Sequence, residues 1–88
     1  MLRNVGAKYV IIGHSENRQL GETDKLINQK IKSALKSKLK VIFCIGETSV
    51  EKRKKITKQI LKKQLKAGLN KIKNKSKIII AYEPVWSI

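Results

Sequence analysis

Near one end, the sequence reads Ile78-Ile79-Ile80-Ala81-Tyr82, an apolar run rich in β-branched residues that stops abruptly at Glu83. Two similar runs precede it: Tyr9-Val10-Ile11-Ile12 and Val41-Ile42-Phe43-Cys44-Ile45. The apolar character of these runs is continuous and does not alternate, which is typical of strands buried on both faces in a parallel sheet. The three runs therefore predict three buried, parallel strands.

Helical periodicity fills the sequence between these runs. Residues 26–35 and residues 56–72 each place apolar side chains on one face at a period of about 3.6 residues, with lysines outside that face. Thr23 is a predicted N-cap, and Asp24 follows it in the first turn, where the helix dipole favours negative charge. Gly68 weakens the second helix slightly. Two amphipathic helices are therefore expected between the strands.

The resulting order is strand, helix, strand, helix, strand, which makes two successive βαβ units with parallel strands. Such units build either an open, doubly wound α/β sheet or a closed (β/α)8 barrel. The first predicted strand is not followed by a Gly-x-Gly-x-x-Gly fingerprint, so the sequence does not support a dinucleotide site. We find no linker, low-complexity tract or repeat beyond the βα alternation.

Length and composition set further limits. The chain has 88 residues, which is short for a domain that must bury a substantial core. A single cysteine, Cys44, excludes an internal disulfide and suits a reducing compartment. No apolar run approaches the roughly 18 residues that a membrane-spanning helix needs, and Arg3 and Lys8 interrupt any signal-peptide core. We expect a soluble, cytoplasmic protein.

The charge is strongly one-sided, with 21 basic and six acidic residues. Such an excess can serve binding to nucleic acid or to an anionic membrane. However, 18 of the 21 are lysines, and residues 52–77 contain no aromatic side chain. Nucleic-acid sites usually add arginine for bidentate contacts and aromatic rings for stacking. We therefore interpret the lysines as a solvated surface and expect neither a nucleic-acid nor a membrane partner.

Polar residues follow each predicted strand directly. They are Gly13-His14-Ser15-Glu16, then Gly46-Glu47-Thr48, then Glu83-Pro84; of the six acids, only Glu51 does not obviously lie at an element end. Function in parallel βα folds gathers beyond the carboxyl ends of the strands. Neighbouring strands lie about 4.8 Å apart, so the first and third strand ends are roughly 10 Å apart. His14 and Glu83 can then face one small substrate, an arrangement suited to proton transfer at carbon.

Each of these residues also has a simpler interpretation. His14 can be a turn residue or a helix cap, and Glu83 a solvated carboxylate. Cys44 is most simply a small buried apolar residue. Trp86 can anchor a loop or fill a core, and Arg18 can pair with a nearby carboxylate or face water. The residues alone leave these alternatives open.

Three motifs in the chain resemble those of the triosephosphate isomerase family. Gly13-His14-Ser15-Glu16, with Arg18 and Gly21-Glu22-Thr23-Asp24, resembles the signature after the family's fourth strand. Cys44-Ile45-Gly46-Glu47 resembles the end of its fifth strand, and Ala81-Tyr82-Glu83-Pro84-Val85-Trp86-Ser87-Ile88 resembles the active-site signature after the sixth. The motifs occur in the family's order across essentially the whole chain. The resemblance implies that residues 1–88 are one partial (β/α)8 TIM-barrel segment, truncated at both ends.

The resemblance also implies an activity. The family interconverts dihydroxyacetone phosphate and glyceraldehyde 3-phosphate through an enediol(ate) in glycolysis and gluconeogenesis, without a cofactor or a metal, as a homodimer. By match, Glu83 would be the catalytic base and His14 the neutral electrophile, a role for which this family is a well-known example. Ser15 and Glu16 would support the site and could begin a short helix. The hinge of a lid over the substrate would be Pro84, Val85 and Trp86.

The chain also departs from the family pattern. Asn17 stands where relatives usually have arginine, and the segment up to Gly21 is one residue shorter; both changes fall in a region of subunit contacts. The family's substrate-binding residues of the first strand would lie before Met1, and its phosphate loops beyond Ile88. We therefore predict that the isolated 88-residue chain is inactive and that it aggregates or self-associates. The alternatives are a lysine-rich module that binds nucleic acid or membrane surfaces, and a non-catalytic half-barrel kept for a protein contact.

Overall fold

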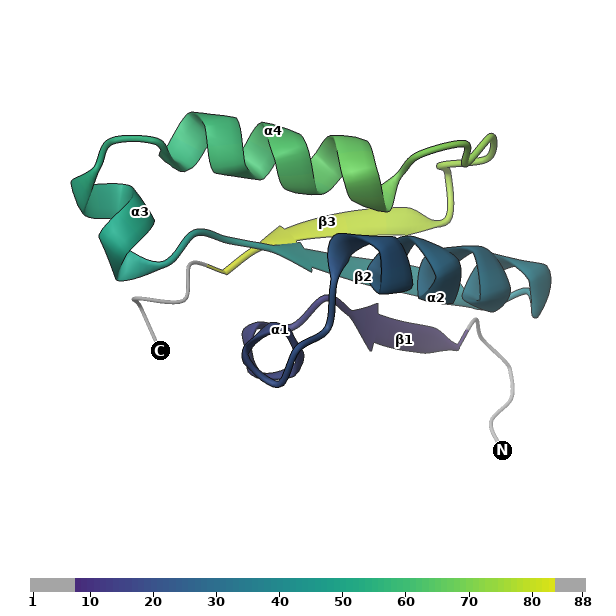
Figure 1. Ribbon diagram of the computed structural model, residues 1–88. Coiled ribbons are helices and arrows are strands. Elements are labelled where there is room, and N and C mark those ends of the chain that lie inside the picture. The colour runs from purple at the N-terminus through teal and green to yellow at the C-terminus, as the bar shows by residue number, and fades with distance from the viewer. Residues whose placement is uncertain (1–7, 84–88) are drawn as a thin grey trace.

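The computed structural model describes residues 8–83, which form a small sheet covered by helices (Figure 1). The chain alternates between strands and helices along its length. In order, the elements are β1 (Tyr9–Ile12), α1 (Ser15–Gln19), α2 (Asp24–Lys36), β2 (Lys40–Ile45), α3 (Ser49–Arg53), α4 (Thr57–Gly68) and β3 (Ile78–Tyr82).

The sheet has the strand order β1-β2-β3, and both neighbouring pairs are parallel. Ile11 pairs with Ile42, and Ile42 pairs with Ile79, so one continuous row crosses all three strands. The prediction of three parallel strands is confirmed, with β2 beginning one residue earlier than expected, at Lys40. All three strands therefore end at the same edge of the sheet.

The two long helices are those predicted between the strands. Thr23 caps α2 as expected, because its hydroxyl accepts a hydrogen bond from the backbone N–H of Leu26 at 3.2 Å. The second helix was predicted over residues 56–72, which is too long, because α4 ends at Gly68. Asn28 of α2 then joins the two helices: its Nδ2 donates to the carbonyl oxygens of Gly68 (2.8 Å) and Asn70 (3.0 Å).

Two further short helices, α1 and α3, lie at the strand ends. Helix α1 begins at Ser15, as the resemblance implied, whereas α3 was not expected. Helix α3 begins with a capping box. The Thr48 hydroxyl accepts from the Glu51 N–H (3.2 Å), and the Glu51 carboxylate accepts from the Thr48 N–H (2.8 Å). The expectation for Glu51 was thus wrong, because this acid does lie at an element end. Short helices of this kind are held by their caps and carry little apolar periodicity.

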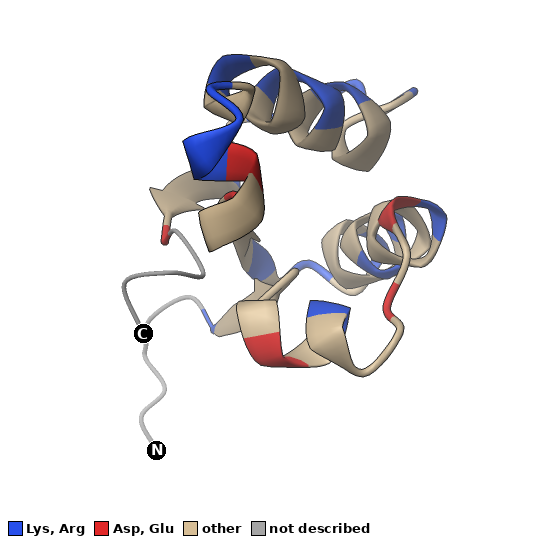
Figure 2. Ribbon diagram, turned by 60° about the vertical axis from the view of Figure 1, so that its left-hand side comes forward, with Lys and Arg blue, Asp and Glu red and all other residues tan. Residues whose placement is uncertain are grey.

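The core lies between one face of the sheet and the helices α2 and α4. Phe43 and Val41 of β2 and Ile27 and Ile31 of α2 are fully buried there, and side chains of α4 complete the layer. Figure 2 shows α2 and α4 on the same side of the sheet. This packing fixes the strands from one side.

The opposite face of the sheet is apolar but uncovered by the described residues. Ile11 is 58% exposed and Ile79 is 51% exposed, with the partly buried Ile42 between them in the same row. The expectation that the strands are buried on both faces therefore holds for only one face in residues 8–83. Isoleucine is mostly buried in folded proteins, so this row is typical of a surface that packs against further protein.

Candidate functional site

The first polar residues at the strand ends are placed by a backbone bend at Gly13. This glycine has φ +85°, a conformation that side-chain-bearing residues rarely adopt. A Cβ at this position would lie 2.8 Å from the carbonyl oxygen of Cys44 on the neighbouring strand. Glycine therefore lets β1 turn tightly against β2, so that the next residue, His14, lies at the edge of the sheet.

His14 makes two contacts with its two ring nitrogens. Nδ1 accepts a hydrogen bond from the backbone N–H of Glu16 at 3.2 Å, which makes His14 the N-cap of α1. Nε2 lies 3.0 Å from Oε1 of Glu83. His14 is therefore a helix cap through Nδ1, and its other ring nitrogen remains free to contact Glu83, so the cap does not exclude the predicted paired site.

The position of Glu83 is set by the sheet. Its backbone N–H donates to the carbonyl oxygen of Ile45 at 2.8 Å, so the hydrogen-bonded ladder with β2 extends one residue past the end of β3. The side chains of Glu83 and His14 remain 45% and 33% exposed. Residues that are 69 positions apart in the sequence thus meet at one edge of the sheet, and both can be reached from solvent.

The hydrogen bonds also assign the protonation pattern of the imidazole. Because Nδ1 accepts from a backbone N–H, its lone pair is occupied and the ring proton belongs on Nε2. Nε2–H then donates to the carboxylate of Glu83. A neutral imidazole with its proton directed into the site can donate to a substrate oxygen, while the carboxylate beside it can accept a proton.

Ser15 and Glu16 differ in their surroundings. Ser15 is 5% exposed, and its hydroxyl oxygen has no hydrogen-bond partner among residues 8–83. It lines a small hollow at the strand ends together with the carboxylate residue Glu83 and with Cys44. Glu16 contributes its backbone N–H to His14, whereas the residue itself is exposed. Supporting roles for these two residues stay predictions.

Arg18 pairs with a carboxylate and does not simply face water. It donates to Oδ1 of Asp24 at 2.9 Å, to the carbonyl oxygen of Gly13 at 2.8 Å and to that of Cys44 at 3.2 Å. One guanidinium thus joins the ends of β1 and β2 to the start of α2. Cys44 is buried, as expected. The pKa of its thiol is raised, mainly by this burial and to a smaller extent by the nearby negative charge of Glu83.

Two buried polar residues support the strand ends: Glu47, which the sequence placed at the end of the second strand, and Gln64, which was not singled out from the sequence. Glu47 is 1% exposed, and its two carboxylate oxygens accept from the hydroxyl of Tyr82 at 2.9 and 3.0 Å. Gln64 of α4 bonds both the N–H and the carbonyl oxygen of Gly46, at 2.9 and 3.0 Å. The sequence signal that could have identified Gln64 is its position as a polar residue within the apolar pattern of α4. Through Tyr82, Glu47 holds the residue next to Glu83.

The bond between Tyr82 and Glu47 predicts a pH dependence. Partial burial and the hydrogen bond to Glu47 raise the pKa of Tyr82 above its usual value of 10.0. The protonated phenol therefore stabilises the fold fully below that usual value, and this contribution is lost as the pH rises through the raised pKa. Tyr82→Phe is expected to remove this loss, measured as the difference in the free energy of unfolding between pH 9 and pH 11 relative to the unaltered chain.

Tyr9→Phe is the matched control, because it removes a phenol from β1 that makes no hydrogen bond in the described part of the chain. It corrects for changes in stability between pH 9 and pH 11 that do not involve the bond to Glu47. An equal change in the pH dependence for both variants would contradict the role of the bond to Glu47.

The remaining predictions for the site concern the lid and bound groups. The predicted hinge, Pro84, Val85 and Trp86, lies outside the described residues. Within residues 8–83, no group of three or more His, Cys, Asp or Glu side chains is arranged to hold a metal ion. The helices of that region are also too short or too polar to cross a membrane.

A parallel α/β sheet with an imidazole and a carboxylate paired at the strand ends is typical of barrel enzymes that move protons at carbon. Comparison with known proteins narrows this class. The family model described as triosephosphate isomerase matches residues 1–88. The chain belongs to the triosephosphate isomerase family, and its fold is part of a TIM barrel.

Individual relatives agree over the same region. The chain is 51% identical to the triosephosphate isomerase of Thermodesulfovibrio yellowstonii, 48% to that of Mycoplasmopsis pulmonis and 49% to that of Zygosaccharomyces bailii. These matches cover 99–100% of this chain but 36% of each relative. The chain thus spans about a third of their length. The family match does not favour the alternative of a lysine-rich binding module.

Proposed function

We propose that this chain supplies the catalytic base and the electrophile of a triosephosphate isomerase. The observation that carries the proposal is the contact of 3.0 Å between His14 Nε2 and Glu83 Oε1, with the other ring nitrogen fixed by a backbone N–H. The substrates would be dihydroxyacetone phosphate and glyceraldehyde 3-phosphate. The rest of the barrel, including the groups that bind the phosphate, would come from sequence outside these 88 residues.

The reaction follows from the positions of the two side chains. Substrate entering the site takes over the hydrogen bond that His14 now makes to Glu83, so that Nε2–H donates to the substrate carbonyl oxygen. The freed carboxylate of Glu83 removes a proton from the adjacent carbon. Donation to the oxygen stabilises the negative charge that develops in the enediol(ate). Return of the proton to the neighbouring carbon completes the isomerisation, with His14 moving protons between the two oxygens.

The proposal extends to the assembly and location of the whole protein. A cytoplasmic homodimer is proposed by analogy with the family. The lid hinge at Pro84, Val85 and Trp86 would close over the substrate and exclude water. Ser15 would act as a neighbour of the base, since its hydroxyl and Glu83 line the same hollow.

The proposal is tested by completing the barrel. We would replace the matching segment of the Thermodesulfovibrio yellowstonii relative by this chain, which is 51% identical to it. The chimera is expected to fold and to isomerise dihydroxyacetone phosphate with kcat within about tenfold of the parent, which corresponds to roughly 1.4 kcal/mol in the barrier. A coupled assay gives kcat, and circular dichroism with urea unfolding verifies the fold. A folded chimera without activity would contradict the proposal.

A further inference from the structure

The outer surface of the helical layer carries a groove that is separate from the strand-end site. It lies between α2 and α4 and has a volume of about 720 Å³, within the range of ligand sites. None of its lining residues belongs to the strand ends. They are Lys25, Asn28, Gln59, Lys62, Lys63, Lys66, Ala67 and Asn70.

No acidic residue lines this groove beside its four lysines. Helix α4 contains no acidic residue, and Figure 2 shows its ribbon free of red. Among residues 8–83, none of the four lysines forms an ion pair with a carboxylate. Most of the acidic residues pair with other partners. These pairs are Glu22 with Lys30, Asp24 with Arg18, Glu47 with Tyr82, Glu51 with Thr48 and Glu83 with His14.

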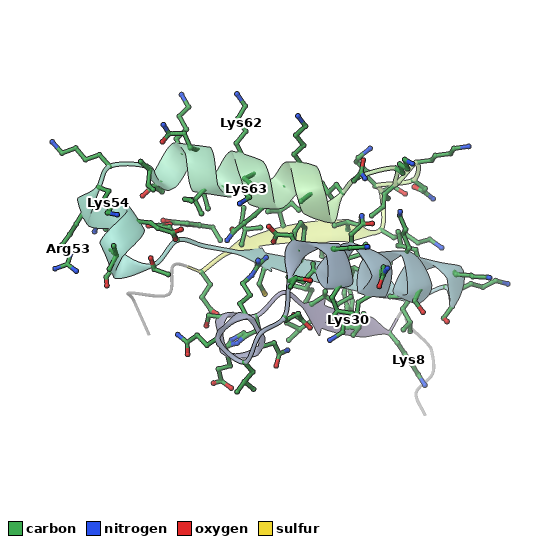
Figure 3. The ribbon with its side chains drawn as sticks, viewed as in Figure 1. Lys8, Lys30, Arg53, Lys54, Lys62 and Lys63 are labelled. Atoms are coloured by element: carbon green, nitrogen blue, oxygen red, sulfur yellow. The ribbon has the colours of Figure 1, made fainter. Side chains whose placement is uncertain are left out.

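The lysine side chains differ in their direction relative to the groove. Figure 3 shows Lys63 directed from α4 toward α2, whereas Lys62 extends away from α2 into solvent. Ammonium groups therefore stand both across the groove and along its rim. A row of positive charges along one helix beside an open groove suits an elongated anionic chain better than a compact ion.

We propose that this groove binds an acidic segment of a partner protein. The carboxamides of Gln59 and Asn70 can donate to and accept from a peptide backbone, and the lysines can pair with aspartate or glutamate side chains. The groove lacks the arginine and aromatic side chains that favour nucleic acid. Its one apolar side chain, that of Ala67, provides no wedge for insertion into a membrane.

The groove stays accessible whatever packs against the bare sheet face. Its lining residues belong to α2, to α4 and to the segment after α4 (Asn70). The apolar row of Ile11, Ile42 and Ile79 lies on the opposite face of the sheet. Self-association through the sheet therefore leaves the groove open. Binding at the groove can be measured with the 88-residue chain.

The test uses a fluorescent peptide of alternating glutamate and glycine and measures its anisotropy at low ionic strength. The triple variant K62Q/K63Q/K66Q is expected to weaken binding about tenfold, because three of the four lysines of the groove are lost. The matched control, K32Q/K36Q/K73Q, removes the same charge from exposed positions outside the groove and is expected to change the Kd less than about twofold.

Two further ligands complete the test: a thymidine oligonucleotide of equal charge and vesicles containing an anionic phospholipid. Binding of either one that exceeds peptide binding would overturn the proposal in favour of nucleic acid or membrane. Equal weakening of peptide binding by the two triple variants would also overturn it, because it would show a diffuse charge effect. Circular dichroism of each variant verifies that helix content is retained.

Discussion

In the chimera that completes the barrel, Glu83→Gln is expected to lower kcat about a thousandfold, with little change in KM. Loss of a positioned general base typically costs a factor of 10² to 10⁴. Glutamine keeps the size of the side chain and can still accept from Nε2 of His14, now 3.0 Å from the carboxylate, but it cannot remove a proton from carbon. The change is measured in the coupled assay and by deuterium uptake from heavy water into the substrate.

Glu51→Gln serves as the matched control. This residue caps α3 and lies outside the paired site, and glutamine retains an acceptor for the Thr48 N–H. The control should therefore keep kcat within about twofold of the chimera, a change below 0.5 kcal/mol in the barrier. If Glu83→Gln kept kcat within about tenfold, another group would have to be the base, and the assignment of Glu83 would fail.

The pairing of His14 and Glu83 could be anticipated because it depends on topology. Parallel strands end at a common edge, so side chains that follow β1 and β3 can reach each other across the end of β2. The strands themselves were found through continuous apolar runs, which reflect the burial that a parallel sheet requires. One face of the sheet is exposed in residues 8–83, but the apolar residues on it still indicate strands suited to burial on both faces.

The supporting contacts could not be derived in the same way. Arg18 bonds the carbonyl oxygen of Cys44 across 26 positions, Gln64 bonds Gly46 across 18, and Tyr82 bonds Glu47 across 35. Such side-chain contacts depend on rotamers and on the relative placement of elements, which periodicity does not specify. Helix α3 is a different case, because the Thr-x-x-Glu pattern of its capping box is visible in the sequence. The basic residues that follow leave no apolar face, so helical periodicity did not identify this helix.

Gly68, the last residue of α4, packs directly against the core. Alone, the exchange Gly68→Ala would favour the helix by up to about 1 kcal/mol. A Cβ here, however, would lie 2.3 Å from Cζ and 2.7 Å from Cε2 of Phe43. Phe43 is fully buried in the core, and protein interiors are close-packed, so a shift of its ring disturbs its neighbours. Overpacking of this kind costs roughly 1–3 kcal/mol or more, so we expect Gly68→Ala to lower the free energy of unfolding by about 2 kcal/mol.

Urea unfolding of the chimera measures this loss, and a double-mutant cycle identifies its cause. Phe43→Leu removes the ring atoms that the added Cβ would meet, at a cost of its own from the lost packing. If the clash is responsible, the double variant will be more stable than the sum of the two single losses predicts, by about 1 kcal/mol or more. Additive losses would show that the alanine acts elsewhere, for instance on the Gly68 carbonyl that Asn28 binds.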